Sequence, residues 1–450
     1  MKRVARHTGT HVWERSVVLN NMKKTLLIVG IVLILLGGGI AFLWFSSETP
    51  ESVFGDLPQA ETETSRTFSP FGKLVELFTG NDSNNQETAT TSTPTTTSRS
   101  VYDMLSMSGA YEVTEEPVAH AEFFYIGTTT GSVLRYIERE TGHVYELNLS
   151  SGTLSRLTNT TVPRIQEAFF GNNGSLVALR YLREDNETIE TFVGAISTTT
   201  SGVSGELDGE FLSQNIQTIA LHPQAPGAFY TLKAGGGAVG RLYDPITHQT
   251  AALFSSPLSE WKAYWSGPET VLLHTKPSSS AQGFAYLLDP ATGGSDRFLT
   301  NISGLTALPN TTGSKILVGS SQTEPKLSLY TTADGSTSSI IGSTFPEKCA
   351  WADTVSVVCA IPESASSIDS WYDGSASFSD SIWRIDTTTD LTDFLFDEDR
   401  LGVQFDATHL SVSSDGTVLS FINKKDSHLW VAGLLEGAPT NTFESESENN

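Results

Sequence analysis

Cysteine is nearly absent from this chain, with only Cys349 and Cys359 among 450 residues. Two cysteines cannot complete a Cys/His zinc cluster, and they cannot hold together a small disulfide-rich scaffold. They flank a predicted hairpin with its loop at 353–355, so they face each other across adjacent antiparallel strands. We therefore expect a structural disulfide between them, and two buried free thiols are the alternative.

Basic side chains are also scarce. The chain has 27 Lys and Arg against 51 Asp and Glu, which gives a formal net charge of −24. Six of the basic residues lie within residues 1–24, where there is a single acid, so the rest of the chain is more acidic still. An acidic body repels phosphate backbones and anionic lipid headgroups, which excludes nucleic acid as a partner. Cationic partners and divalent metals remain compatible with this charge.

Familiar catalytic motifs are missing as well. The sequence has no G-x-S-x-G nucleophile elbow, no HExxH, no P-loop and no zinc-type Cys/His cluster. Acidic residues gather between 380 and 399 without EF-hand spacing, so we expect a solvated surface there, and calcium stays open without support. The sequence therefore names no catalytic, cofactor or metal residue.

One long apolar run is present, at residues 25–45, with 21 residues and no charge. A helix of this length spans about 30 Å, the thickness of the hydrocarbon core of a bilayer. Lys23 and Lys24 precede the run, which places the N-terminus in the cytoplasm. We expect residues 1–24 to be a cytoplasmic tail, 25–45 a transmembrane helix in the cell membrane, and the rest to be extracytoplasmic.

Aromatic residues close this apolar run. Phe42, Trp44 and Phe45 are expected at the outer interface of the membrane, where aromatic rings concentrate. A cleaved signal peptide is the alternative to a single-pass signal anchor. Its best small-x-small site, at 39–41, would leave a mature end that starts Phe-Leu-Trp-Phe, so the uncleaved anchor is preferred.

Residues 46–107 are rich in Thr, Ser, Glu and Asn and carry little periodic hydrophobic pattern. Such a segment cannot bury enough apolar area to offset its chain entropy, so a disordered acidic stalk is expected. Apolar residues at i, i+3, i+4 and i+7 predict one short helix near 70–79. The acidic end, 437–450, is expected to be a disordered tail.

A repeat dominates residues 108–436. Short apolar strands are joined by turns at positions 131, 174, 227, 268, 313, 353 and 416, with an average spacing of about 47 residues. A second series of turns, rich in Asp, Asn and Gly, falls between them at 148, 244, 289, 334 and 386. Two interleaved series indicate four strands per unit. The pattern predicts an all-β, seven-bladed β-propeller, with six or eight blades as alternatives.

The S-x-D-G hairpin at 413–416 and the D-P-x-T-G turn at 289–293 resemble those of TolB-type, WD-repeat-like propellers of bacterial envelope proteins. This resemblance implies the fold and little about function, because proteins that share it include binding scaffolds, lactonases and propeller caps of peptidases. Propellers usually close by pairing both chain ends in one blade. The last unit shows three strands, so its fourth is expected near 111–113.

The longest insertion within a unit, 361–381, joins the second and third strands of the sixth unit. Trp371, Tyr372, Asp373 and Phe378 make it a candidate ligand-contact loop, since exposed aromatics stack on glycans or anchor peptides. The alternative is that the loop folds down and buries its rings.

Three functions follow from the tether and the missing catalytic motifs. The first is a membrane-anchored, non-enzymatic binding or scaffolding module for an unidentified envelope protein or glycan, with membrane lipid contacted by the N-terminal helix. The second is a hydrolase or lyase with a carboxylate- or calcium-dependent site at the channel mouth. The third is a structural subunit of an envelope or secretion complex.

Overall fold

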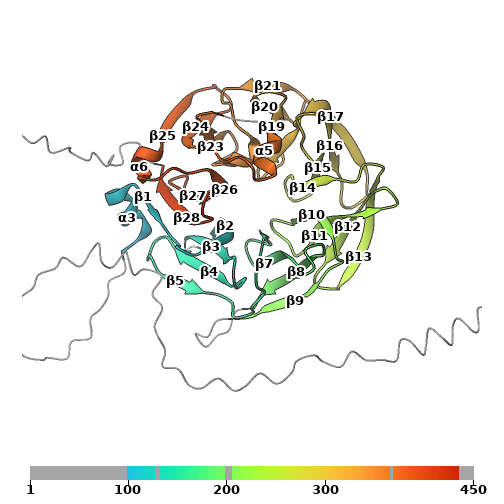
Figure 1. Cartoon of the computed structure of the whole chain (residues 1–450), viewed down its shortest axis with the longest axis horizontal. Helices are drawn as coiled ribbons and strands as arrows, with labels where there is room; N and C mark the ends of the chain where they lie inside the picture. Colours follow the sequence, from blue (N-terminus) through green and yellow to red (C-terminus); the bar gives the residue numbers. More distant parts are fainter. Residues whose placement is uncertain (1–98, 128–130, 198–204, 365–367, 435–450) are drawn as a thin grey trace, which may run out of the picture. The chain divides into compact units, whose positions relative to one another are not determined.

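The described part of the chain forms a ring of seven four-stranded antiparallel sheets (Figure 1). This computed structural model describes residues 99–127, 131–197, 205–364 and 368–434. The predicted seven-bladed, all-β propeller is confirmed, and with it the fold-level resemblance to WD-repeat-like propellers. We number the sheets as blades 1–7 in chain order, starting from β2.

The first four blades follow one another without interruption. Blade 1 contains β2 (Val118–Tyr125), β3 (Ser132–Glu138), β4 (Val144–Asn148) and β5 (Leu154–Arg156). Blade 2 contains β6 (Glu167–Gly171), β7 (Leu176–Leu182), β8 (Ile189–Ile196) and β9 (Leu207–Phe211). Blade 3 contains β10 (Ile216–Leu221), β11 (Ala228–Ala234), β12 (Gly237–Asp244) and β13 (Gln249–Ser256). Blade 4 contains β14 (Trp261–Trp265), β15 (Val271–Thr275), β16 (Gln282–Leu288) and β17 (Ser295–Ser303).

The remaining blades carry the short helices. Blade 5 contains β18 (Thr306–Pro309), β19 (Lys315–Ser321), β20 (Pro325–Thr331) and β21 (Thr337–Ile340). The 3-10 helix η1 (Pro346–Lys348) leads into blade 6, which contains β22 (Cys349–Trp351), β23 (Ser356–Pro362), β24 (Asp380–Asp386) and β25 (Thr392–Phe396), with α5 (Ile368–Tyr372) between β23 and β24. After α6 (Glu398–Leu401), blade 7 contains β26 (Ala407–Val412), β27 (Val418–Asn423), β28 (Leu429–Gly433) and β1 (Ala110–Glu112).

Local turn chemistry explains why the strands begin and end where they do. Each of the seven predicted hairpin positions falls between the first and second strands of a blade. The five Asp or Asn positions fall at the end of a third strand or in the turn that follows it. Asp289 is typical: its carboxylate accepts hydrogen bonds from Ala291 N (2.8 Å) and from the hydroxyl of Thr292 (2.7 Å). Gly293 then adopts a φ of 75°, which few other residues tolerate.

Apolar side chains between neighbouring blades hold the ring together. Phe229 of blade 3, for example, is fully buried against Trp261 and Leu273 of blade 4. Burial of each such side chain stabilises the fold by about 1.5–3 kcal/mol. Because a sheet of four strands has two faces to cover, each blade depends on both of its neighbours.

The ring closes in blade 7, where the two ends of the propeller pair. Strand β1 runs antiparallel to β28, with Tyr111 opposite Val431. The closure expected near 111–113 is therefore confirmed. Arg400 of α6 reinforces it, because its guanidinium donates hydrogen bonds to the carbonyl oxygens of Gly109 (3.0 Å) and Gly433 (3.1 Å).

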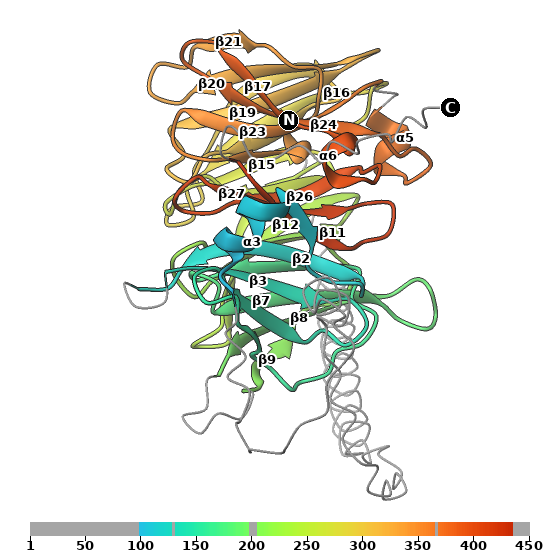
Figure 2. The ribbon, with the colours of Figure 1, turned by 90° about the vertical axis from the view of Figure 1, so that its left-hand side faces the viewer.

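Helix α3 (Val101–Ser108) covers the seam between blades 7 and 1 and corrects one predicted boundary. Residues 99–107 were expected in the disordered stalk. Instead, Ser100 caps the helix, and Val101, Met104 and Leu105 pack into a core shared with strands β4 and β28. Burial of these three side chains offsets the entropy cost that the stalk prediction relied on. Seen from the side in Figure 2, α3 lies at the rim of the ring near β2.

Several predicted segments lie outside the described residues. They are the cytoplasmic tail 1–24, the transmembrane run 25–45 with Phe42, Trp44 and Phe45, the stalk up to residue 98 with its helix near 70–79, and the tail 437–450. Among the residues that are described, none of the helices is both long and apolar enough to cross a bilayer.

Candidate functional site

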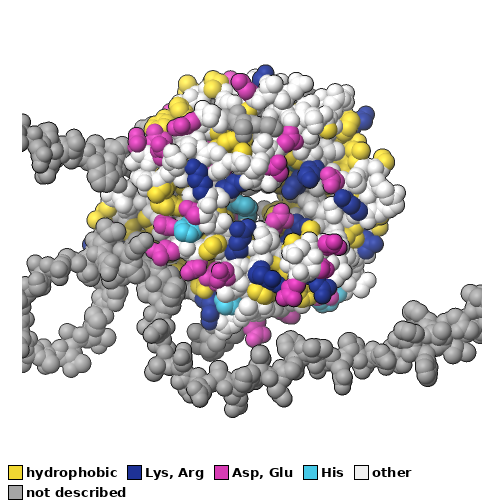
Figure 3. Space-filling model, in the orientation of Figure 1, with side chains coloured by type: hydrophobic (Ala, Val, Ile, Leu, Met, Phe, Trp, Pro, Cys, Tyr) yellow, Lys and Arg dark blue, Asp and Glu magenta, His cyan; other side chains and the backbone are white. Residues whose placement is uncertain are grey.

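The first strands of the blades surround a central channel. Neighbouring first strands contact one another around most of the ring, and η1 lies between those of blades 5 and 6. All of them run in the same direction, from the face that carries α5 to the face that carries the first hairpin turns, so position along a first strand gives depth in the channel. We call these the α5 face and the hairpin face. On the α5 face, side chains of Lys, Arg, Asp, Glu and His gather around the central opening (Figure 3).

Glu347 is a carboxyl on the α5 face, and the charge of Lys262 in β14 acts on it. It lies in η1 and accepts a hydrogen bond from the hydroxyl of Tyr372 in α5. The surrounding protein removes most of the water from its carboxyl, and this burial raises its pKa. The hydrogen bond from Tyr372 and the charge of Lys262 lower the pKa, but by less than burial raises it. Among the described residues, Oε2 of Glu347 has no hydrogen-bond partner.

The candidate ligand-contact loop lies against this site, and its residues divide into two groups. Trp371 and Phe378 are only 7% and 5% exposed, and they pack with Phe345 and Ile368 in a small core of their own. Both rings are therefore buried, as in the alternative in which the loop folds down. Asp373 is exposed, at the surface of the loop.

A buried ionic cluster holds the loop in place. The ammonium of Lys348, with no exposed surface, lies 2.5 Å from Asp406 Oδ1 and 2.7 Å from Asp380 Oδ2. Asp406 also accepts hydrogen bonds from Trp371 Nε1 (3.2 Å) and Phe378 N (3.0 Å). Burial tends to raise the pKa of Asp406, but Lys348 and these donors hold it below its usual value. Burial dominates at Asp380 and raises its pKa to about 6.

The α5 loop also crosses to blade 4. The carboxylate of Asp369 accepts hydrogen bonds from the backbone N–H (3.1 Å) and the hydroxyl of Ser279, which lies between β15 and β16. The loop of blade 6 therefore passes beside blade 5 and is fixed at both ends. Figure 1 shows α5 inside the ring, beside the central opening.

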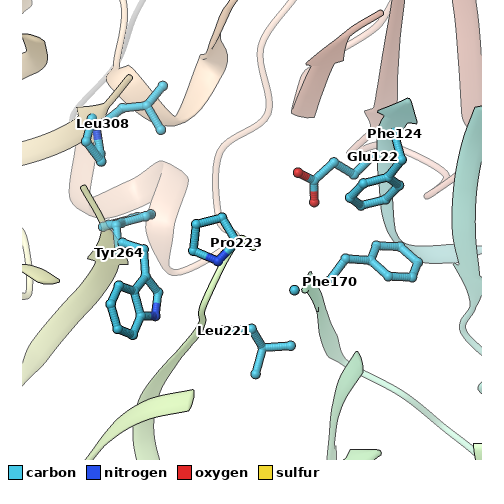
Figure 4. A pocket seen from close by; sticks show the side chains of 10 residues that line it. Glu122, Phe124, Phe170, Leu221, Pro223, Tyr264 and Leu308 are labelled. Atoms are coloured by element: carbon cyan, nitrogen blue, oxygen red, sulfur yellow. The ribbon is translucent and has the colours of Figure 1, made fainter. Parts of the chain in front are cut away.

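A cavity of about 210 Å³ lies in the half of the channel nearer the hairpin face. First strands or their ends from blades 1–5 supply its ten lining residues, which are Glu122, Phe124, Phe170, Gly171, Leu221, Pro223, Tyr264, Trp265, Leu308 and Pro309. In Figure 4 the carboxylate of Glu122 points away from the Phe124 ring, towards Pro223 and Tyr264. The cavity therefore combines aromatic walls with one carboxylate.

Ring contacts fix two of the aromatic walls. Phe124 and Phe170 meet edge to face, with centroids 5.4 Å apart. On the blade 4 side, Trp265 Nε1 donates to the carbonyl of Ala220 (3.1 Å). The His222 ring lies 4.4 Å from Trp265. These contacts hold the rings in place before any ligand arrives, which lowers the entropy cost of binding.

Tyr264 belongs to the cavity and is also close enough to Glu347, on the α5 face, to feel its charge. It lines the cavity, and burial together with the negative charges of Glu347 and Glu167 raises its pKa above the usual range. On the opposite side, His120 Nε2 lies 3.6 Å from Glu122 Oε2. His120 Nδ1 is buried without a hydrogen-bond partner among the described residues.

The two cysteines have a structural role. Cys349 and Cys359 face each other across β22 and β23, in the register predicted for the hairpin, and they form a disulfide. Both are buried between blades 5 and 6, in a core with Leu317 and Ile385. The bond therefore fixes the innermost strand of blade 6 to its neighbour.

The acidic side chains at 380–399 do not gather around one point. Asp380 is buried in the ionic cluster, Asp386 caps a turn by accepting from Thr388 N (2.7 Å), and Asp397 caps α6. In the described ranges, no group of three His, Cys, Asp or Glu side chains is arranged to hold a metal ion.

Sequence reasoning missed the residues that line the channel. Glu122, Tyr264 and Leu308 are separated by many residues in the chain and meet only because the ring closes. One signal was available: the first strand after each blade boundary was identifiable, and polar or aromatic residues at alternate positions on it, such as Lys262 and Tyr264, point to the axis.

Comparisons with known proteins show similarity at the level of fold. No protein-family model matches the chain, and no curated protein sequence matches it. Among solved structures, an oligogalacturonate lyase from Vibrio parahaemolyticus is 12% identical, with a TM-score of 0.48, over 73% of this chain and 94% of that one. An oligogalacturonate lyase in complex with manganese is 11% identical, with a TM-score of 0.46, over 71% and 92%.

The tricorn protease is also similar, at 10% identity and a TM-score of 0.45. The match covers 72% of this chain but only 34% of the protease. Likenesses this distant carry no argument about activity.

Proposed function

We propose that this chain is a membrane-tethered binding module that takes up one side chain of an extracytoplasmic protein in its channel, on the hairpin face. The observation that carries the proposal is the cavity, in which five blades present four aromatic rings and one carboxylate around a space of about 210 Å³. Small-molecule sites usually exceed roughly 300 Å³. The smaller volume therefore favours a single side chain over a cofactor or a glycan.

The tether belongs to the same proposal. The apolar run 25–45, with Lys23 and Lys24 before it, supports a single-pass anchor with the propeller outside the cytoplasm. An anchored propeller works as a binding or scaffolding module because the anchor keeps it near envelope partners, which raises their effective concentration.

The proposal is tested with the full-length chain in detergent micelles, immobilised and exposed to an extracytoplasmic fraction. Leu308→Trp fills the cavity, whereas Leu391→Trp adds the same ring to a turn where the leucine is 69% exposed. We expect that proteins retained by wild type are not retained by Leu308→Trp and are still retained by Leu391→Trp. Both variants should have the melting temperature of wild type. Equal retention by the two variants would refute the cavity as the binding site.

A second candidate function, a lyase or hydrolase, is favoured by Glu347. Its pKa is raised, a tyrosine hydroxyl contacts it, and one oxygen has no partner among the described residues. A carboxyl titrating nearer to neutral pH is suited to general acid or base catalysis. The test compares wild type with Glu347→Gln on a panel of oligosaccharide, ester and peptide substrates. Turnover that the variant lacks supports this candidate, and no turnover of any of them by the wild type, or equal turnover by the variant, contradicts it. The role of structural subunit stays a prediction.

A further inference from the structure

The lining of the cavity defines the charge of the group that it takes. Of the ten lining residues described above, Glu122 alone is charged. Its side chain is 42% exposed, so water is present nearby and screens part of the charge. The remaining polar atoms of the lining side chains are the hydroxyl of Tyr264 and the indole N–H of Trp265, and the latter is already bonded to Ala220.

Neighbouring cations do not neutralise Glu122. The guanidinium of Arg135 lies 6.0 Å from the centroid of the Phe124 ring, but it pairs with Glu146 at 2.7 Å. His120, a group able to carry a positive charge, lies 3.6 Å from the carboxylate. A neutral imidazole leaves that carboxylate charged, and a protonated one would compete with a bound cation.

Aromatic faces beside a carboxylate form an environment that attracts cations. A ring quadrupole attracts an ammonium or guanidinium within about 6 Å of its centroid, and the attraction strengthens when the cation is partly desolvated. The net charge of −24 adds a long-range attraction of the same sign. An anionic group would instead meet Glu122 with no cation in the lining to oppose it.

We propose that this cavity binds an alkylammonium or guanidinium group, with Glu122 as its ion-pair partner and Phe124, Phe170 and Tyr264 as its aromatic walls. This inference rests on the proposed function and names the chemistry of its ligand. A lysine or arginine side chain of a protein and a free polyamine offer the same group, and they differ in whether the flanking peptide adds contacts at the hairpin face.

The test measures binding to the full-length chain in detergent at pH 8 by calorimetry. The probes are a capped hexapeptide with one central lysine, the same peptide with norleucine in place of lysine, and spermidine. We expect the lysine peptide to bind at least ten-fold more tightly than the norleucine peptide. Spermidine binding as tightly as the lysine peptide assigns the site to free amines, whereas weaker spermidine binding assigns it to proteins; both support a cationic ligand.

Two carboxamide variants isolate the carboxylate. Glu122→Gln keeps the shape of the side chain and removes its charge, and we expect at least a ten-fold loss of affinity for the lysine peptide. Glu269→Gln is the matched control, since this exposed residue lies in the first hairpin turn of blade 4, on the same face and outside the cavity. It should change affinity less than two-fold. Each variant is used only if its melting temperature matches wild type.

The outcomes separate this inference from the proposed function. Lysine and norleucine peptides that bind equally, with both affinities lost in Leu308→Trp, would overturn the cationic ligand and keep the channel as a binding site. Affinity that survives in Glu122→Gln would overturn the ion pair. Binding of every probe that survives in Leu308→Trp would refute both proposals, because the cavity would not be the place of binding.

Discussion

The cluster of Lys348, Asp380 and Asp406 shows how one lysine supports two different carboxylates. Asp406 has several donors around it, whereas Asp380 has the Lys348 ammonium and the backbone N–H of Ala407 (2.7 Å), and its Oδ1 has no partner among the described residues. Removing a partner from a buried, hydrogen-bonded ion pair is costly, because the remaining charge cannot reach water.

We predict that Asp406→Asn lowers the free energy of unfolding by about 3–5 kcal/mol, since it leaves donors of the α5 loop without a charged acceptor. Asp380→Asn is the matched control in the same cluster and should cost less, because its carboxyl already resists ionisation. Thermal unfolding of the full-length chain measures both. Equal losses would contradict the unequal roles assigned to the two carboxylates.

The pH dependence of the same pair gives a second readout. The pKa of Asp380 is about 6 in the folded protein against 3.8 for an ordinary Asp. Between these values the folded state keeps a proton that the unfolded state has released, so this group lowers stability as pH rises through that window. The stability of wild type relative to Asp380→Asn should therefore fall between pH 4 and pH 6. A difference that does not change with pH would contradict the raised pKa.

Among the elements, helix α3 is one that sequence patterns missed, like the shorter helices η1, α5 and α6. The hairpins were predictable because their turns depend on local residues: Asp, Asn and Gly fix each turn within a few positions. The short helix depends on a surface that exists only once blades 1 and 7 are adjacent. Tyr102, for example, donates to Asp415 (2.9 Å), a residue of the last blade. Local composition alone, rich in Ser and Thr just before residue 99, favoured disorder.

We predict that α3 is required for closure of the ring. Leu105 is 4% exposed and Met107, two positions later, is 55% exposed. Leu105→Asp should lower the free energy of unfolding by at least about 3 kcal/mol, because it removes apolar burial and places a charge in the core. Met107→Asp should change it by less than about 0.5 kcal/mol. Thermal unfolding of the full chain compares the two, and a small effect of Leu105→Asp would show that β1 closes the ring without the helix.

The α5 loop shows a similar limit of sequence reasoning. Its place between the second and third strands of blade 6 follows from the repeat. The repeat does not predict whether its aromatic side chains face solvent or the core. That depends on Phe345, Lys348 and Asp406, which approach from η1 and blade 7. The positions of loop residues on a propeller are thus set by neighbouring blades as much as by their own sequence.

For the whole molecule, the proposed function requires the propeller to lie outside the cytoplasm. We predict that a reporter enzyme active only outside the cytoplasm, fused after residue 450, is active in cells. Replacing Lys23 and Lys24 by Glu should reduce that activity, because the positive charge retained in the cytoplasm sets the orientation. The matched control is replacement of Lys2 and Arg3, which lie farther from the apolar run. An inactive reporter in the wild type would contradict an extracytoplasmic propeller.

The closure in blade 7 has a mechanical consequence. Any tension carried by the chain before residue 99 enters the ring at α3 and then at β1, a strand of only three residues at the outer edge of its sheet. Pulling on β1 alone would peel it from β28 and open the ring. Because α3 also contacts blade 1, through Val101 N and the carbonyl of Leu149 (2.8 Å), the pull is shared between the two blades that meet at the seam.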